Sequence, residues 1–218
     1  MIGIYFSGTG NTKHCVEKLV KLLDASAQSF PLEHTEMIQI LTKHDIIVLG
    51  YPTQFSNAPI IVRDFIKNHS SLWNGKKVFC VNTMGLFSGD GTGCTARILR
   101  KRGATILGGL QIKQGNYPQD GLSFFSHLKG LFGQRLWFYG KTAGYTDKLK
   151  ISEKCVGCGL CVSLCPTKNL SLRDGKATAE DRCTMCYRCI SRCPKKAITL
   201  LGDEVIEQCR FEKYGSGE

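Results

Sequence analysis

The feature that most constrains this chain is a repeated cysteine pattern near its C-terminal end. Eight of its 12 cysteines lie between Cys155 and Cys193, in two runs of the form C-x2-C-x2-C-x3-C-P. Residues 155–172 align with residues 183–200 at a constant offset of 28, which matches four cysteines, a proline and an apolar tail. The repeat predicts two structural halves related by a pseudo-twofold axis. Such dense, regular cysteines indicate metal-ligating thiolates, because a disulfide scaffold would be short and secreted with its cysteines spread out.

The N-terminal residues, MIGIYF, contain neither the basic region nor the cleavage site of a secretion signal. No run approaches the roughly 18 to 20 apolar residues of a membrane span. We therefore expect a cytoplasmic protein, in which reduced cysteines more often bind metals than pair as disulfides.

Within each run, the first three cysteines are close enough for one loop to direct three thiolates at a single cubane. The fourth cysteine begins a separate segment and points away from that loop. Zinc is the alternative, since it readily takes four-cysteine sites. Zinc sites usually use paired C-x2-C knuckles separated by a longer spacer, so the two triplets favour iron–sulfur clusters.

The segment from Ile151 to Leu201 resembles the bacterial two-cluster ferredoxins, which carry this run and whose fourth cysteine ligates the other cluster. The resemblance implies two 4Fe–4S clusters that pass single electrons at low potential. Pro166 and Pro194 would fix the turn after each crossing ligand. The implied ligands are Cys155, Cys158, Cys161 and Cys193 for one cluster, and Cys183, Cys186, Cys189 and Cys165 for the other.

The first half of the chain alternates strand and helix patterns. Continuous β-branched, apolar runs separated by helical periodicity imply a parallel sheet covered on both faces. A doubly wound α/β fold is the economical interpretation. The expected strands are Ile2–Phe6, a weak one near Ser26–Leu32, Asp45–Tyr51, Lys77–Asn82 and Ala104–Ile112, and the expected helices are Asn11–Asp24, Ile60–Ile66 and Thr95–Arg102.

A glycine-rich turn, Ser7-Gly8-Thr9-Gly10-Asn11-Thr12, joins the first expected strand to the first helix. Glycines let the backbone wrap around an anion, and the helix N-terminus offers free N–H groups and a positive dipole end. The loop lacks the lysine of a P-loop, which suits a phosphate monoester that stays bound. A capped helix start is the alternative, although one cap residue would suffice for it. We therefore expect FMN at this loop.

This loop resembles the first FMN loop of flavodoxins, and residues 1–118 resemble that family. The resemblance implies a five-stranded parallel sheet of order 2-1-3-4-5 with FMN at the carboxyl ends of the strands. Two further loops would then flank the flavin ring, one after the strand ending at Gly50 and one after the strand ending at Asn82. Their expected FMN-binding residues are Tyr51, Pro52, Thr53, Gln54 and Phe55 in the first, and Asn82, Thr83, Met84, Gly85 and Gly91 in the second.

Some aromatic residues have two open interpretations. Tyr51, Phe55 or Phe87 stacks on the flavin ring, or each simply packs within its loop. The aromatic, basic segment Leu122–Tyr139 is expected to cover the sheet or the seam between domains, with a membrane-surface helix as the alternative.

Four cysteines lie outside the repeat and are not expected ligands. Cys80 is expected as a small buried side chain in a strand. Cys15 on the first helix, Cys94 in a glycine-rich loop and Cys209 are expected as free thiols. The five histidines form no metal-ligand spacing and no catalytic pair, so no catalytic residue is predicted.

The formal net charge of +11 lies mostly in the N-terminal part, because residues 149–218 carry 12 Lys and Arg against 9 Asp and Glu. With its cofactors bound, the protein would have a net charge of about +5, once the charges of eight thiolates, two oxidised cluster cores and an FMN phosphate are added. Nucleic acid is one partner for a basic surface. The redox motifs instead favour acidic redox proteins as donors and acceptors, and a homo-oligomer stays open.

The whole chain resembles the flavodoxin–ferredoxin fusions of anaerobes, sometimes called EFR-type ferredoxins. We expect a flavodoxin-like domain over 1–118, a connecting segment over 119–148 and a small α+β ferredoxin domain over 149–218. The resemblance implies low-potential electron transfer between FMN and the clusters on behalf of other redox proteins. A flavin-dependent reductase of a quinone, flavin, disulfide or oxygen is the alternative. No second nucleotide fingerprint is visible, which argues against direct NAD(P)H oxidation.

Overall fold

The computed structural model describes residues 1–85, 89–113 and 144–214. Apart from Gly8–Gly10, the described residues up to Lys113 form one compact unit, and those from Gly144 onward form another. Each unit is treated by itself. Among the described residues, every helix is too short or too polar to cross a bilayer.

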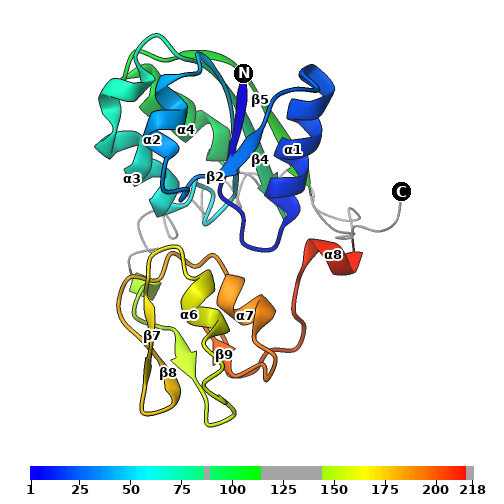
Figure 1. Ribbon diagram of the computed structural model, residues 1–218, viewed down its shortest axis with the longest axis vertical. Coiled ribbons are helices and arrows are strands. Elements are labelled where there is room, and N and C mark those ends of the chain that lie inside the picture. Colours follow the sequence, from blue (N-terminus) through cyan, green and yellow to red (C-terminus); the bar gives the residue numbers. More distant parts are fainter. Residues whose placement is uncertain (86–88, 114–143, 215–218) are drawn as a thin grey trace, which may run out of the picture. The chain divides into compact units, whose positions relative to one another are not determined.

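The N-terminal unit is a five-stranded, all-parallel sheet of strand order β2-β1-β3-β4-β5. Helices cover it on both sides: Figure 1 shows α1 on one side of the sheet and α2, α3 and α4 on the other. Its elements are β1 (Ile2–Tyr5), α1 (Asn11–Leu23), β2 (Ser29–Pro31), α2 (Met37–Thr42), β3 (Ile46–Pro52), α3 (Ile60–Asn68), the 3-10 turn η1 (Ser70–Trp73), β4 (Lys77–Met84), α4 (Gly91–Arg100) and β5 (Thr105–Lys113).

The flavodoxin-like fold class predicted from the sequence is confirmed, strand order included. Central strands β1 and β3 are buried on both faces because helices cover both, which explains their unbroken apolar runs. The weak β2 strand exists but is only three residues long, paired through Gly3 with Ser29. Helix α2 was not predicted, since its six residues are too few for a helical period to show.

Two glycines allow α1 to lie close against the sheet. The buried residues of α1 are Thr12, Val16 and Val20, one stripe at every fourth position. A Cβ on Gly3 of β1 or on Gly50 of β3 would overlap Val16. Small residues at these two sites therefore fix the distance between α1 and the sheet, and with it the place of the helix N-terminus beside the ends of β1 and β3.

Helix α4 begins earlier than predicted, at Gly91 instead of Thr95. The sequence GDGTG reads as a loop because glycine disfavours helices. Packing overrides this preference: a Cβ on Gly91 would sit 3.0 Å from Asn82 Oδ1, and Thr95 Oγ1 donates to the Gly91 carbonyl over 3.2 Å. Cys94, expected in a loop, is consequently a buried residue of α4.

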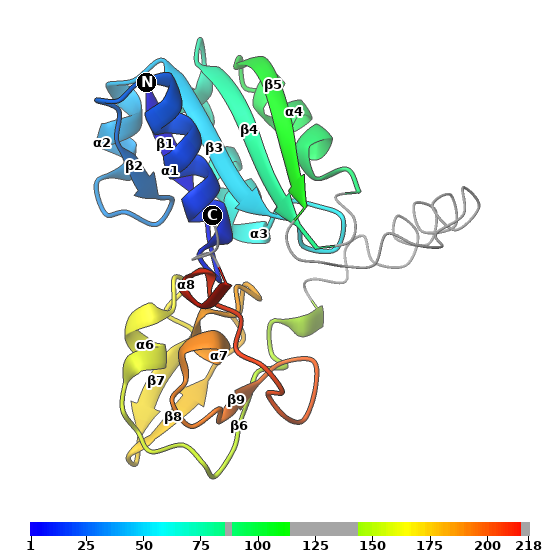
Figure 2. The same ribbon diagram turned by 90° about the vertical axis from the view of Figure 1, so that its right-hand side faces the viewer.

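The C-terminal unit is small and built from short elements (Figure 2). Strands β6 and β9 form one antiparallel pair, and β7 and β8 form another, closed at a tight turn through Asp174 and Gly175, both of positive φ. The elements are β6 (Lys150–Ile151), α6 (Leu160–Leu164), β7 (Leu170–Arg173), β8 (Lys176–Ala179), α7 (Arg188–Arg192), β9 (Ile198–Thr199) and α8 (Phe211–Tyr214).

The predicted pseudo-twofold is visible in this unit. Helices α6 and α7 begin and end at residues 28 apart. Leu170 pairs with Ala179 in one ladder. The residues equivalent to them in the repeat, Ile198 and Ile151, pair with each other in the other ladder. Each half therefore contributes the same helix and one strand to each ladder, so the repeat in sequence is a repeat in structure.

Some residues with expected roles lie outside the described residues. These are the aromatic segment Leu122–Tyr139, Phe87, and most of the expected connecting segment 119–148.

Replacing Gly50 with alanine should destabilise the N-terminal unit, because the new methyl group overlaps Val16. Forcing an extra methyl into a packed core costs about 1–3 kcal/mol. Chemical denaturation followed by circular dichroism would measure this loss. Gly109→Ala in β5 is the matched control, since its Cβ has only ordinary contacts, the nearest at 3.5 Å. Val16→Ala should restore part of the stability of the Gly50→Ala protein, and equal stability of the two single glycine variants would contradict the packing argument.

Candidate cofactor sites

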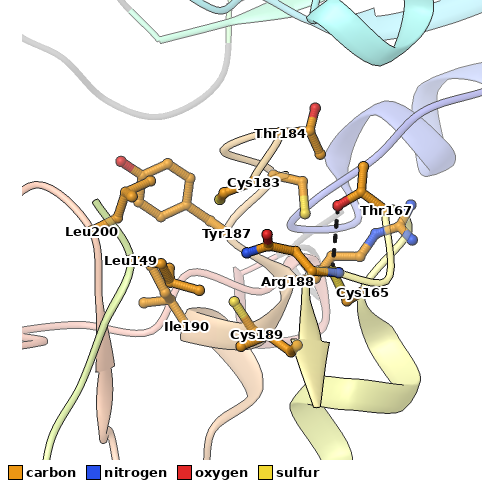
Figure 3. A pocket seen from close by; sticks show the side chains of 13 residues that line it. Leu149, Cys165, Thr167, Cys183, Thr184, Tyr187, Arg188, Cys189, Ile190 and Leu200 are labelled. Atoms are coloured by element: carbon orange, nitrogen blue, oxygen red, sulfur yellow. Dashed lines mark hydrogen bonds between the residues drawn. The ribbon is translucent and has the colours of Figure 1, made fainter. Parts of the chain in front are cut away.

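Two cavities in the C-terminal unit are each lined by four cysteines of the repeat. Cavity A is lined by Cys155, Cys158, Cys161 and Cys193. Cavity B is lined by Cys165, Cys183, Cys186 and Cys189. Figure 3 shows Cys165, Cys183 and Cys189 at the wall of cavity B.

These are the two sets that the ferredoxin resemblance implied, each with its crossing cysteine. The crossing follows from the backbone at the end of each short helix. Cys165 caps α6 and Cys193 caps α7, and both have extended backbone, with φ/ψ of −75°/114° and −67°/117°. The chain therefore straightens at both fourth cysteines and carries each thiol away from its own triplet.

Backbone N–H groups point at sulfur atoms of the repeat in both halves. Asn169 N donates to Cys165 Sγ over 3.2 Å, and Ala197 N donates to Cys193 Sγ over 3.3 Å, two contacts at the repeat offset. Met185 N donates to Cys183 Sγ and Ala177 N to Cys155 Sγ, each over 3.4 Å. Such donors stabilise negative charge on thiolate sulfur, and they tune the potential of a cluster held by those sulfurs.

Burial favours the protonated form of four of these thiols. Burial raises the pKa of Cys186 to about 11 and that of Cys189 to about 12, and it raises the pKa of Cys161 and Cys183 as well. Because a thiolate is the form that ligates iron, assembly of a cluster in these cavities releases protons.

The donor set and the space around it fit iron–sulfur clusters. Among the described residues, no three His, Cys, Asp or Glu side chains converge on a single metal-ion position. The sulfur atoms surround a cavity in each half, with N–H donors behind them, and this suits a bulkier centre of several atoms.

In the N-terminal unit, the glycine-rich turn lies between the end of β1 and the start of α1, as predicted. Gly10 has a φ of 104°, a conformation that residues with a Cβ rarely adopt, and α1 begins at the next residue. No acidic residue lies in the first turn of α1, so no carboxylate competes for its free N–H groups. The turn also stands where strand order reverses between β1 and β3, the place where open α/β sheets bind ligands. The site therefore fits the phosphate of FMN.

The expected ring loops follow β3 and β4, and hydrogen bonds join them at their base. Thr53 N donates to the Thr83 carbonyl over 2.7 Å, and Thr53 Oγ1 donates to Asn82 Oδ1 over 2.6 Å. Asn82 Nδ2 donates in turn to the Tyr51 carbonyl over 3.2 Å. Asn82 is fully buried, so its side chain holds the two loops in register.

Thr12 and Thr83 hydrogen-bond each other in the interior. Their hydroxyls are 2.7 Å apart and both residues are buried. These two expected FMN-binding residues thus connect the start of α1 to the end of β4. Their side chains position the loops, while the backbone around them forms the edge of the site.

Tyr51 is not available to stack on a flavin ring. Its side chain is 0% exposed and its hydroxyl donates to the Gly91 carbonyl over 3.2 Å. A stacking residue would have to face the open end of the sheet, so this interpretation of Tyr51 was wrong. The sequence showed a tyrosine at a strand end, but it could not show that the ring belongs to the face covered by α4.

The loop after β3 makes a tight turn. Gln54 and Asn57 exchange backbone hydrogen bonds of 2.8 and 3.0 Å, and Phe55 and Ser56 between them have positive φ values of 47° and 59°. Phe55 is half-buried at the tip of this turn. Asn57 was not among the expected site residues, yet it is buried and its Oδ1 accepts from Ala58 N over 2.8 Å.

The remaining expected FMN residues lie at the edges of these loops, because β3 and β4 each run two residues beyond their predicted ends. Pro52 and Met84 end β3 and β4, Gly85 follows Met84, and Gly91 begins α4. Asp90 N donates to the Ser56 carbonyl over 3.1 Å, which ties the second loop to the first.

Two family models match the chain: a flavodoxin domain over residues 2–126 and a 4Fe–4S dicluster domain over residues 154–197. No curated protein sequence matches it. Solved structures similar to the chain include two-electron-reduced Megasphaera elsdenii flavodoxin, at 26% identity and a TM-score of 0.47, covering 62% of this chain and 99% of that one. A flavodoxin from the domain Archaea has 18% identity and a TM-score of 0.46, covering 62% of this chain and 96% of that one.

The flavodoxin model alone spans more than half of the chain, and the dicluster model covers the cysteine repeat. Together these domains support electron transfer that involves FMN and iron–sulfur. The chain belongs to the flavodoxin family and, with its C-terminal 4Fe–4S domain, is a flavodoxin–ferredoxin fusion.

Proposed function

We propose that the protein carries one FMN and two 4Fe–4S clusters and passes low-potential electrons between them and other redox proteins. The observation that carries this proposal is the grouping of eight cysteines into two cavities of four, each completed by the crossing cysteine of the other half. When bound, FMN exchanges electrons singly or in pairs, and each cluster exchanges one.

The residues of the C-terminal unit would hold and insulate the clusters. Cys155, Cys158, Cys161 and Cys193 would ligate the cluster of cavity A, and Cys165, Cys183, Cys186 and Cys189 that of cavity B. The N–H groups of Asn169 and Ala197 would stabilise the thiolate charge of the two crossing ligands.

The residues of the N-terminal unit would hold the flavin by its phosphate and its ring. The turn from Ser7 to Asn11 would donate backbone N–H groups to the phosphate at the start of α1. Thr53, Gln54 and Phe55 on one side, and Thr83, Met84 and Gly85 on the other, would border the ring. Asn82 and Thr12 would keep these loops in place from below.

The chemistry of the ring loops favours electron transfer over a reductase that protonates a substrate. In the described part of these loops, the ionisable side chains are Tyr51, buried in the core, and Asp90, which forms an ion pair with Arg97. Burial raises the pKa of Tyr51 further above its ordinary value. Neither group is placed to exchange a proton with a small substrate at the flavin.

We propose acidic redox proteins as donors and acceptors. The net formal charge of +11 supports this proposal, because a basic carrier attracts acidic partners and accelerates their encounter.

Replacing one cysteine of either ligand set with alanine should remove the cluster that this set would ligate. Protein purified without oxygen should contain about eight irons, eight sulfides and one FMN per chain. Cys158→Ala should lose the cluster of cavity A and Cys186→Ala that of cavity B, leaving about four irons in each case. Iron and sulfide analysis with electron paramagnetic resonance would check this. Cys209→Ala, an exposed cysteine outside both sets, is the control and should keep about eight irons. A Cys158→Ala protein with both clusters intact would refute the ligand assignment.

Reducing equivalents given to the clusters should reach the flavin. In a stopped-flow experiment, partially reduced protein should redistribute electrons between the iron–sulfur and flavin absorption bands within one chain or one oligomer. Reduced protein should be oxidised faster by a redox protein than by quinone, free flavin or oxygen alone. Rapid oxidation by one of these small molecules without a protein acceptor would favour the reductase instead.

A further inference from the structure

Cavity A opens at a face on which apolar side chains are exposed. Val156 is 58% exposed, Leu160 40% and Leu172 47%. Val156 and Leu160 line cavity A, and Leu172 lies beside Gly159, which separates Cys158 from Leu160. Cys158, a cluster ligand in the proposal above, is itself exposed. We call Val156, Cys158, Leu160 and Leu172 the cavity A face.

Lysines stand at the edge of the cavity A face. Lys195 lines cavity A, and Lys154 precedes the first cysteine of the set. Among the described residues, neither lysine has an ion-pair partner, whereas Glu153 is paired with Lys176 and Glu180 with Arg173. Asp174, in the turn between β7 and β8, is an acid without such a pair in the described part of the chain. The edge of the face is therefore basic on balance.

We propose that the cavity A face is the docking surface for an acidic redox protein, which exchanges electrons through the exposed cluster. This inference rests on the proposed function and specifies where its partner binds. A small apolar centre with a charged edge is typical of protein interfaces. The charges guide the encounter, and Cys158, a proposed ligand of the cluster of cavity A, is exposed on the face that the partner would contact.

Charge reversal at the face should slow electron transfer more than the same change elsewhere on the unit. The probe is a purified acidic two-cluster bacterial ferredoxin, reduced and mixed with the oxidised, fully loaded protein. At low salt, Lys154→Glu with Lys195→Glu should lower the second-order rate constant about tenfold or more. Lys150→Glu with Lys213→Glu changes the net charge equally at lysines paired with Asp203 and Glu207, and should change the rate constant less than about twofold.

A second pair of variants tests the apolar centre without altering charge. Val156→Ser should weaken docking, and Ile206→Ser, at a residue 86% exposed, should not. Iron analysis must first show about eight irons in every variant. An equal decrease of the rate constant in both charge-reversed proteins would overturn the proposal. Self-association that Val156→Ser abolishes would overturn it too, because a second copy of the chain would then occupy the face. The flavin–cluster exchange within the chain does not depend on the added ferredoxin, so failure of the docking surface and failure of the proposed function are distinguishable.

The two cavities also differ in the residues at equivalent backbone positions of positive φ. The repeat places a glycine there in the first half and a residue with a side chain in the second. Gly159 and Tyr187 precede α6 and α7 at equivalent sites, with φ values of 74° and 61°. Gly157 and Met185 form a second such pair, with φ values of 66° and 53°. Left-handed backbone is strained for a residue with a Cβ. The second half thus retains side chains where the first half uses glycine, and such strain concentrates at functional sites.

The Tyr187 side chain forms part of the wall of cavity B. It lies there with Leu149, Ile190 and Leu200, and its hydroxyl points away from the labelled cysteines (Figure 3). At the equivalent place in cavity A, Gly159 offers no side chain. The cavities are otherwise similar in charge, because Arg188 lines cavity B and Lys195 lines cavity A.

We infer that Tyr187 excludes water from the cluster of cavity B and so holds its reduction potential below that of the cluster of cavity A. Reduction adds negative charge to an anionic centre, and water stabilises that charge, so exclusion of water disfavours the reduced form. One contact acts the other way, since the Thr167 hydroxyl is 3.5 Å from Cys165 Sγ. The Tyr187 variants isolate the ring because they leave this contact in place.

Redox titration of the fully loaded protein, followed by electron paramagnetic resonance, would test this role of Tyr187. Two midpoint potentials are expected, and Tyr187→Gly should raise the lower one by about 59 mV, a tenfold change in the reduced fraction for one electron. Tyr187→Phe should keep the original value, because the ring and not the hydroxyl excludes water. Gly159→Tyr should lower the other potential. A Cβ there has only an ordinary contact of 3.7 Å with Leu172, and the φ of 74° strains the new side chain as the φ of 61° strains Tyr187.

A purely structural role for Tyr187 would alter unfolding but not the potentials. Unchanged midpoints in a Tyr187→Gly protein with about eight irons would overturn the inference. A shift in Tyr187→Phe as large as that in Tyr187→Gly would overturn it too, because the hydroxyl would then be responsible. If iron analysis instead shows that the unmodified protein lacks a second cluster, the proposed function has failed first.

Discussion

Each half of the C-terminal unit gives its fourth cysteine to the cavity of the other half, and the rest of that unit depends on this exchange. Cys165 leaves α6 for the cavity of the second triplet, and Cys193 leaves α7 for that of the first. Neither half can complete its own set of sulfur atoms. In the proposed ligand sets, ligation would therefore join the two halves across the pseudo-twofold axis.

The secondary structure of this unit is too limited to stabilise it alone. One ladder pairs two residues from each strand and the other pairs four, while α6 and α7 have five residues each. Isolated two-stranded ladders and single-turn helices are marginal in water. Small domains of this kind obtain much of their folding free energy from metal ligation, so cluster assembly and folding are coupled. The N-terminal unit instead has a hydrophobic core in which Val16 and Val20 of α1 pack with Val48 of β3 and Val81 of β4.

The sequence predicted the parts of the fold that periodicity and spacing control. The parallel sheet follows from apolar runs separated by helical periodicity, whereas its strand order was implied by the resemblance to flavodoxins. The offset of 28 residues reappears in both helices and in both ladders. The division of the cysteines into two sets required the resemblance to two-cluster ferredoxins, because spacing alone does not say where a fourth cysteine goes.

The sequence failed where tertiary contacts override local preference. A glycine-rich stretch became the first turn of α4 because Gly91 packs against Asn82. Tyr51 has the right position along the chain to stack on a flavin, but the alternation of β3 turns its ring to the interior. The left-handed backbone at Met185 and Tyr187 was also not foreseen, since only comparison with the equivalent glycines reveals it.

Two clusters in identical surroundings would have equal reduction potentials, so electrons would favour neither of them. The fold supplies the symmetry through its repeat, and single residues remove it: glycine against tyrosine before the two helices, and exposed Val156 and Leu160 at one cavity. If the more shielded centre is the harder one to reduce, electrons collect on the cluster beside the exposed face. In the proposed function, the residues that break the internal symmetry would also give electron transfer its direction, with a strained backbone at Tyr187.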